Sequence, residues 1–362
     1  MSDYPDRIKE LEDEISRTQY NKATQHHVGL IKAKIAILKG RAEAAKTKKG
    51  AAHGFSVRKS GEATVCMVGF PSVGKSTLLN ALTNAESRIA AYAFTTLTCI
   101  PGILEYKSAK IQILDVPGLI SGASAGAGKG KEVLSVIRNA DMVILIADIF
   151  DLKQLETIRN ELYKADIRID EEKPNVTVKQ SAIGKLQIFI PKKLTNTSPE
   201  TIKAILREYR VNSGTVAIKE DLTAERLIDA LEGNRVYMPS IIVLNKADMV
   251  SNNEAERAAK LTGGMPLSAE NRTNMEELKE VIYKTLRFIR VYLKERGKKV
   301  DNEPLIMRQG STIADVCRKL HREFVSKFRY ARVWGKSAKH PGERFMLGHV
   351  LQDNDAVEIK VR

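Results

Sequence analysis

The stretch that most constrains this chain is residues 64–76, where an apolar run breaks into a glycine-rich turn. Residues 65–68 are apolar, as in a buried strand. The turn has the spacing Gly69-x-x-x-x-Gly74-Lys75-Ser76, and apolar residues at helical spacing follow it. In this order of strand, turn and helix, backbone N–H groups and the positive end of a helix dipole face an anion. The stretch therefore predicts a phosphate-binding loop.

The residues of this loop have separate expected roles. Lys75 would reach the β- and γ-phosphates of a nucleotide, and the Ser76 hydroxyl would hold Mg²⁺. A chance Gly-Lys-Ser turn is the alternative, but the strand and helix on either side argue against it. The residues expected to bind nucleotide here are Gly69, Phe70, Pro71, Ser72, Val73, Gly74, Lys75, Ser76 and Thr77.

A second motif follows the predicted strand at residues 111–114, which ends in Asp115-Val-Pro-Gly118. Asp-x-x-Gly is a common turn by itself, but its position about forty residues after a phosphate loop gives it meaning. Asp115 would hold Mg²⁺ through water, and the N–H of Gly118 would sense the γ-phosphate. A threonine from the segment before these strands would complete the metal's ligands when GTP is bound.

A third motif, Asn245-Lys246-Ala-Asp248, follows an apolar run at residues 241–244 and indicates which base is bound. The Asp248 carboxylate can accept from both N1–H and the 2-amino group of guanine. Adenine lacks both donors, so it would leave a desolvated carboxylate unpaired. The stem of Lys246 would pack over the base. Further on, Ser268 and Ala269 are placed to give a backbone N–H to guanine O6.

Composition bounds the remaining possibilities. The 362 residues carry 59 Lys+Arg against 44 Asp+Glu, a net charge of +15, which favours a polyanionic partner. Three widely spaced cysteines predict neither a disulfide framework nor a metal cluster. The charged start argues against a signal peptide, and no apolar run approaches the ~20 residues of a membrane span. We therefore expect a cytoplasmic protein with no membrane partner.

Together these motifs, with Phe94-Thr-Thr-Leu97, resemble the Obg group of translation-type GTPases and, most of all, the developmentally regulated GTP-binding (DRG) family. The resemblance covers nearly the whole chain. It implies an α/β fold: a doubly wound P-loop core, an inserted αβ subdomain and a C-terminal ubiquitin-like β-grasp (TGS) domain. It also implies GTP and GDP as ligands, an association with ribosomes and translation, and Thr96 rather than Thr95 as the metal ligand.

The resulting domain plan has five parts. A basic helical region is expected at 1–60, the first part of the GTPase domain at 61–166, the insertion at 167–237, the second part at 238–300 and the TGS-like domain at 301–362. One long basic helix is expected at 273–299, and a helix capped by Ser311 within the last domain. The N-terminal region is read equally well as a solvated hairpin or an RNA-contacting arm.

Two departures from related enzymes bear on hydrolysis. Leu119 stands where Ras-like enzymes place a water-orienting glutamine, so intrinsic turnover should be slow unless another group, such as an accessory protein, positions the water. Some related GTPases bind K⁺ through a phosphate-loop asparagine. Ser72 stands there in this chain, so K⁺ activation stays open without support from that residue. The glycine-rich run 121–131 is read as a second switch segment, with a passive loop as the alternative.

Basic and aromatic residues alternate near the C-terminus, with nine bases against two acids in residues 318–344. This composition is typical of RNA contact through phosphates and stacked bases, although the aromatic residues could equally form the core of a small domain. The RNA-contacting candidates are Arg322, Lys327, Arg329, Arg332 and Lys336.

Two functions fit the whole sequence. The first is a GTPase that hydrolyses GTP to GDP and phosphate, with Lys75, Thr96 and Gly118 as catalytic groups, and acts as a switch on a ribosome or other structured RNA. The second is an RNA- or ribosome-binding adaptor in which GTP is mainly structural. Leu119 favours the adaptor slightly, whereas the complete set of motifs favours the enzyme.

Overall fold

A computed structural model describes residues 4–19, 21, 24–47, 60–83, 100–116, 128–191, 193–295, 297 and 299–361. Its contacts divide the chain into two compact units, each made of two segments of the sequence. The first unit joins Met1–Gly54 to Glu171–Tyr237, and the second joins Phe55–Asp170 to Met238–Arg362. No helix in the described part of the chain is long and apolar enough to cross a membrane.

A six-stranded sheet forms the centre of the second unit, and its strands are β1 (Ala63–Gly69), β2 (Ile100–Tyr106), β3 (Ala109–Asp115), β4 (Met142–Asp148), β10 (Ser240–Asn245) and β11 (Met265–Pro266). The order is β11-β10-β4-β1-β3-β2, and every pair is parallel except β2 with β3. The helices around it are α3 (Lys75–Leu82), α4 (Gly128–Arg138), α5 (Lys153–Lys164), α8 (Asn252–Thr262) and α9 (Met275–Thr285).

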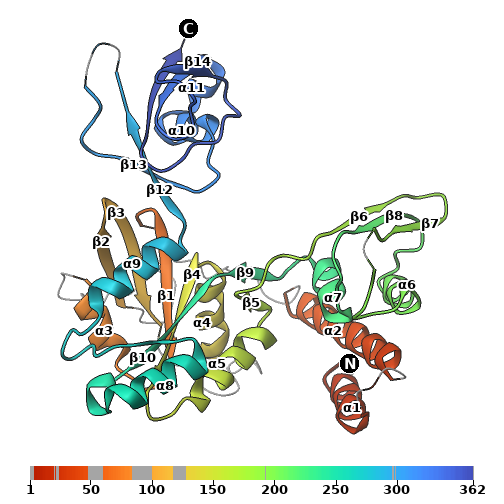
Figure 1. Cartoon of the computed structure of the whole chain (residues 1–362). Helices are drawn as coiled ribbons and strands as arrows, with labels where there is room; N and C mark the ends of the chain where they lie inside the picture. The colour runs from red at the N-terminus through yellow and green to blue at the C-terminus, as the bar shows by residue number, and fades with distance from the viewer. Residues whose placement is uncertain are drawn as a thin grey trace. The chain divides into compact units, whose positions relative to one another are not determined.

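Helices cover both faces of this sheet (Figure 1). Leu78 and Leu79 of α3 and Leu278 of α9 pack in one apolar cluster with β1, β3 and β4. Figure 1 shows α4 and α5 on the opposite face. Burial from both sides explains why β1 and β4 are continuous apolar runs rather than alternating ones.

The C-terminal part of the second unit is a five-stranded sheet packed on two short helices. Its strand order is β13-β12-β16-β14-β15, and the sheet combines antiparallel pairs with the parallel pair β12–β16. Its elements are β12 (Phe288–Leu293), β13 (Leu305–Arg308), α10 (Ile313–Leu320), α11 (Arg322–Ser326), β14 (Phe328–Trp334), β15 (Glu343–Phe345) and β16 (Asp355–Val361).

Two sequence-based expectations for this region are wrong. The long helix expected at 273–299 ends with α9, because Arg287 adopts a φ of +54° that no right-handed helix allows, and β12 follows. Ile289 and Val291 are buried on one side of β12. Ile289 and Leu293 are four residues apart, a spacing that fits one face of a helix and also one face of a strand. The cap of α10 is Thr312 rather than Ser311, with Asp315 completing a capping box.

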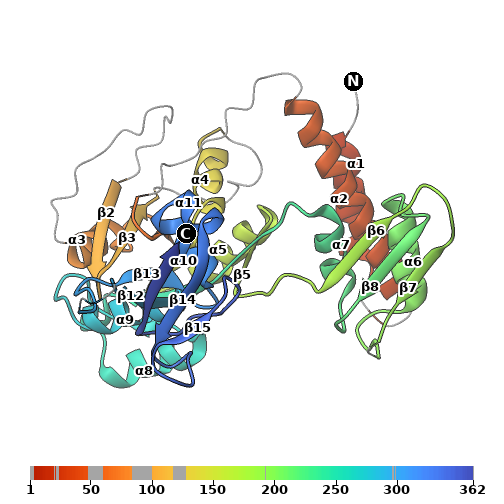
Figure 2. The same cartoon turned by 90° about the horizontal axis from the view of Figure 1, so that it is seen from above.

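The first unit pairs a helical hairpin with the inserted segment (Figure 2). Its elements are α1 (Tyr4–Arg17), α2 (Gln25–Thr47), β6 (Val176–Gln180), β7 (Leu186–Phe189), α6 (Pro199–Glu208), β8 (Gly214–Ile218) and α7 (Ala224–Glu232). The three strands form one sheet in the order β6-β8-β7. Two short strands, β5 (Ile167–Ile169) and β9 (Val236–Met238), pair as a separate sheet. The N-terminal helices and the insertion, expected as separate regions, thus fold together.

Helix α2 has two differently shaped packing faces. Ile31 and Ile35 meet Leu11 of α1 in a small apolar cluster. On another side, Ala33 is fully buried against α6 and α7. A Cβ added at Gly29 would lie 3.3 Å from side-chain atoms of both α6 and α7, so small residues let α2 approach the insertion closely.

Enlarging this small-residue face should destabilise the first unit. We expect Ala33→Leu to lower the free energy of unfolding by about 1–3 kcal/mol, because a close-packed interface cannot take three more heavy atoms without shifting. Urea unfolding monitored by circular dichroism measures the change. Arg41→Leu, which places the same side chain at an exposed position of α2, is the matched control. Equal stability of the two variants would contradict the interface.

Candidate nucleotide site

Five strands of the parallel sheet end side by side, and the ends of β1, β3 and β10 carry residues of the predicted motifs. The last residues are Gly69, Asp115, Asp148, Asn245 and Pro266, of β1, β3, β4, β10 and β11. We call this side of the sheet the carboxyl edge. Ligands of open α/β sheets bind at such an edge, because the connecting loops and helix starts gather there.

The loop between β1 and α3 depends on its two glycines. Gly74 caps α3 with a φ of +90°, and a Cβ there would lie 2.2 Å from the Asn245 side chain. A Cβ on Gly69 would lie 2.4 Å from the carbonyl oxygen of Ile146 on the neighbouring strand. Ser72 between them also has a positive φ, of +62°. Both glycines are therefore required for the loop to curl against β4 and β10.

Lys75 folds back over this loop. Its ammonium donates to the carbonyl oxygens of Gly69 at 3.1 Å and Phe70 at 2.8 Å, and its side chain is buried. Burial lowers the pKa of Lys75, and the nearby Asp115 carboxylate opposes this effect. An ammonium group held inside the loop in this way can form a charge-assisted hydrogen bond to a phosphate oxygen.

Ser76 and Asp115 form the polar centre of the site. The Ser76 hydroxyl donates to Oδ2 of Asp115 at 2.6 Å. Oδ1 of Asp115 is buried, and none of the described residues forms a hydrogen bond with it. A buried carboxylate oxygen without a partner, beside a hydroxyl, is a donor set that Mg²⁺ accepts. Among the described residues there is no group of three or more His, Cys, Asp or Glu that could hold a metal by itself.

Asn245 joins the phosphate loop to the base-recognition segments. Its Nδ2 donates to the carbonyl of Val73 at 2.8 Å, and its Oδ1 accepts from the N–H of Ala269 at 3.0 Å. Ser268 is buried, and its hydroxyl accepts from the N–H of Asn271 at 3.1 Å. One amide thus links three loops that are far apart in the sequence.

The residues that follow Asn245 turn outward, so that the rest of the motif lies at the protein surface. Lys246 has a left-handed backbone and starts the short 3₁₀ helix η2 (Ala247–Met249), on which Asp248 is exposed. The Lys246 ammonium lies 2.6 Å from Oδ2 of Asp148. Sequence reasoning missed Asp148, although a single carboxylate at the end of an apolar strand was a visible signal.

The structure brings together most of the predicted nucleotide-binding residues. The loop at residues 69–74, with Lys75 and Ser76, lies beside Asp115 and Asn245, and Thr77 is exposed on the first turn of α3. Thr95, Thr96, Gly118 and Leu119 lie outside the described residues, as does most of the predicted switch run at 121–131. Their roles stay predictions.

Comparison with known proteins accounts for three successive parts of the chain. Residues 64–180 match the family model described as a 50S ribosome-binding GTPase. Residues 184–288 match the model of the C-terminal region of that domain, and residues 289–361 match the TGS domain. The start of the TGS match agrees with β12 as the first strand of the C-terminal sheet.

Several relatives match this chain over nearly its whole length. An uncharacterized GTP-binding protein of Methanocaldococcus jannaschii is 50% identical, over 99% of this chain and 93% of its own length. The developmentally-regulated GTP-binding protein 2 of Homo sapiens is 40% identical, over 98% of both chains. Its homolog in Dictyostelium discoideum is 42% identical, also over 98% of both. The chain belongs to the DRG family. Its predicted P-loop GTPase fold with a C-terminal TGS domain is confirmed.

In this DRG protein the aromatic residues near the C-terminus divide between two faces of the TGS sheet. Phe324 and Phe328 pack in the core with Ala331 and Val333, against α10. Side chains alternate along a strand, so Tyr330, Arg332 and Trp334 lie on the other face. We call this second face the outer face. The register of the neighbouring strands adds Tyr292, Lys294, Arg344, Ala356, Glu358 and Lys360 to this face.

Cations and rings are interleaved on the outer face. The Lys294 ammonium lies 4.1 Å from the Trp334 ring centroid, and the Arg344 guanidinium lies 4.6 Å from that of Tyr330. The Glu358 carboxylate is buried and pairs with Lys360 at 3.1 Å. Of the five RNA-contacting candidates, only Arg332 is placed on this face by the strand register. Arg322 is the first residue of α11 and Lys327 follows its last, on the core side of the sheet.

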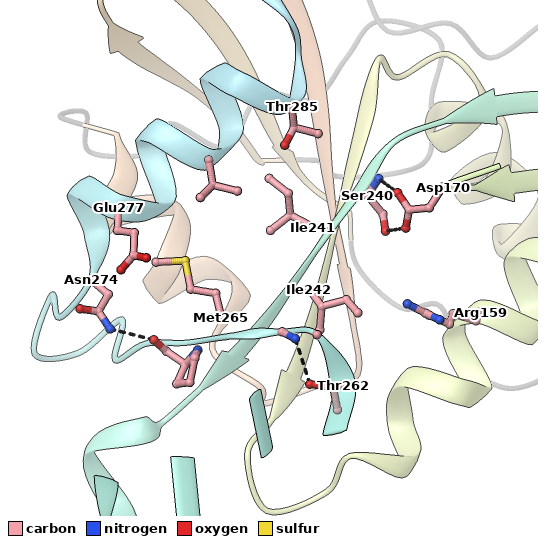
Figure 3. Close-up of a pocket in the computed structure, with 14 residues that line it drawn as sticks. Arg159, Asp170, Ser240, Ile241, Ile242, Thr262, Met265, Asn274, Glu277 and Thr285 are labelled. Atoms are coloured by element: carbon pink, nitrogen blue, oxygen red, sulfur yellow. Dashed lines mark hydrogen bonds between the residues drawn. The ribbon is translucent and has the colours of Figure 1, made fainter. Parts of the chain in front are cut away.

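A pocket of about 640 Å³ opens beside the first half of β10, away from the predicted motifs (Figure 3). Several of its polar groups bond to one another. Asp170 accepts from the backbone N–H of Ser240 at 2.6 Å, and Asn274 donates to the carbonyl of Pro266 at 2.9 Å. The pocket contains none of the predicted phosphate-, metal- or base-binding residues. The carboxyl edge, which brings them together, is therefore the candidate site.

Proposed function

We propose that this protein binds guanine nucleotides at the carboxyl edge and hydrolyses GTP to GDP and phosphate, as a switch associated with the ribosome or another structured RNA. The observation that carries the proposal is the bridge made by Asn245. It holds the phosphate loop and the base-recognition segments on one edge, where a single nucleotide can meet both.

The phosphate end is served by the loop and by Lys75. Backbone N–H groups of the loop and the start of α3 bind the phosphate oxygens, and Lys75 leaves its carbonyl partners to pair with the β- and γ-phosphates. Once GTP is bound, these groups are already in place and stabilise the charge that develops on the γ-phosphate without further reorganisation.

The residues Ser76 and Asp115 fit a magnesium ion, with Thr96 as a further proposed ligand. Ser76 would bind it directly, and Asp115 would bind it through water. When bound, the ion neutralises charge between the β- and γ-phosphates. The chain's own contribution is to hold a hydroxyl and a carboxylate together at the start of α3, and to place the N–H of Gly118 near the γ-phosphate.

The base end is served by Asp248 and Lys246. An exposed carboxylate beside the site can accept two hydrogen bonds from guanine, and the N–H of Ala269 would complete recognition at O6 once it exchanges its bond to Asn245. The selectivity arises because adenine would leave this carboxylate without donors.

The outer face of the TGS sheet supports the RNA part of the proposal. Lys294, Arg332 and Arg344 can pair with phosphates, and Tyr330 and Trp334 offer rings on which unpaired bases stack. This refines the RNA-contacting candidates: Arg332 stays among them, and Lys294 and Arg344 join it. The alternative function, an adaptor with a structural nucleotide, is separated by phosphate release, because only a switch is accelerated when ribosomes are added.

Isolated protein should hydrolyse GTP slowly, at about 10⁻⁴ to 10⁻² s⁻¹, because Leu119 cannot orient water.

Lys75→Ala and Ser76→Asn should impair nucleotide or metal binding without unfolding the chain, which circular dichroism verifies. Phosphate release should be measured in both KCl and NaCl, because Ser72 leaves potassium activation open. A brisk rate that survives Lys75→Ala would refute the proposed site.

A further inference from the structure

We propose that Asp148 is a positioning residue for guanine recognition, a role that rests on the nucleotide function proposed for the carboxyl edge. Asp148 is the last residue of β4, and the six apolar residues before it are all fully buried. The carboxylate contributes nothing to the apolar packing of the strand. The role of Asp148 must therefore lie in its contacts at the carboxyl edge.

Both oxygens of this carboxylate are engaged. Oδ2 lies 2.6 Å from the Lys246 ammonium, and Oδ1 accepts from the N–H of Phe150 at 3.1 Å. Asp148 lies opposite Asn245 in the strand register, and the N–H of Ile149 donates to the Asn245 carbonyl at 3.1 Å. The carboxylate is thus oriented by Lys246 and Phe150, and the backbone beside it is bound to the residue that links the loops.

Lys246 is held at its two ends. Its backbone has a φ of +65° and a ψ of +31°, a conformation that side chains disfavour, and the next N–H, of Ala247, donates to the carbonyl of Leu267 at 3.0 Å. Asp148 holds the other end. A lysine side chain is otherwise flexible. When both its backbone and its ammonium are fixed, its methylene groups form an ordered apolar surface on which a planar base can pack.

Exposure separates this role from a purely structural one. The side chains are 35% exposed for Lys246 and 18% for Asp148. Ion pairs that reach solvent contribute little to folding stability. The effect of breaking this pair should therefore appear in nucleotide affinity rather than in the unfolding temperature.

Asp148→Asn in the full chain tests the proposal, because it keeps the side-chain volume and the acceptor for Phe150 but removes the charge. We expect the affinities for GDP, GTP and inosine diphosphate to fall by the same factor of roughly tenfold. The substitution weakens the charge-assisted bond that positions Lys246 against the base, and it leaves the contacts to the phosphates and to the 2-amino group unchanged. Asp170→Asn, the same change on an aspartate bound to Ser240, is the control and should leave all three affinities unchanged.

A double-mutant cycle with Lys246→Met decides whether Asp148 acts through the lysine. If it does, the double variant binds GDP as weakly as Lys246→Met alone. Additive losses would overturn the role, as would a lowered unfolding temperature with unchanged GDP affinity. Wild-type protein that binds ADP as tightly as GDP would instead overturn the proposed function, and this role with it.

Discussion

Replacing Asp248 with asparagine should convert a guanosine-nucleotide site into a xanthosine-nucleotide site. Xanthine carries a carbonyl where guanine carries its 2-amino group, so an amide can donate where the carboxylate accepted. The affinity for GTP should fall by about a hundredfold or more, because a site built to bind two donors is left mismatched. The affinity for xanthosine triphosphate should rise above that for GTP.

Competition titration with a fluorescent nucleotide measures this exchange. Asp248 is exposed and makes no structural contact that the substitution would break in the described chain, so the fold should be retained. Asp151→Asn, at an exposed aspartate that follows β4, is the matched control and should keep the preference for GTP. If wild-type protein bound ATP as tightly as GTP, the base assignment would be wrong.

The core of this fold could be predicted because its constraints are local and continuous. A strand buried on both faces is a run of apolar residues, as in β1 and β4, and a loop that curls around phosphate needs glycine at fixed positions. Gly69 and Gly74 could be recognised from spacing alone, and the structure gives the reason in their close approach to β4 and Asn245.

Features that depend on distant contacts could not be predicted in the same way. In β14 an irregularity between Phe328 and Tyr330 interrupts the alternation, so Arg329 and Arg332 are three residues apart and the strand is clear only from its register with β16. The docking of Ala33 on the insertion requires two segments more than a hundred residues apart in the sequence to meet. Asp148 was visible in the sequence, but its role depends on a lysine that only the sheet brings near.

The outer face of the TGS sheet should be the main RNA contact, and reversing its charge should weaken binding strongly. We expect Lys294→Glu, Arg332→Glu and Arg344→Glu together to lower affinity for ribosomes or single-stranded RNA by at least about a hundredfold at 0.1 M salt. Each phosphate contact contributes roughly 0.7 log units per log unit of salt, so loss of three contacts should also flatten the salt dependence by about two. GTP affinity should not change, because the phosphate loop lies on another sheet.

The matched control must separate the effect of position on the outer face from the effect of total charge. Arg318, Arg322 and Lys327 lie on or beside α10 and α11, the helices that cover the core side of the same sheet, so reversing them changes the net charge equally. Truncating the chain after residue 300 would be a poorer test, because it leaves β12 without β13 and β16. Co-sedimentation and RNA anisotropy across a salt series should show the large loss only for the outer-face variant. Equal losses in both variants would reduce the contact to non-specific attraction by a basic protein, and the N-terminal helices or the insertion would then be the next regions to test.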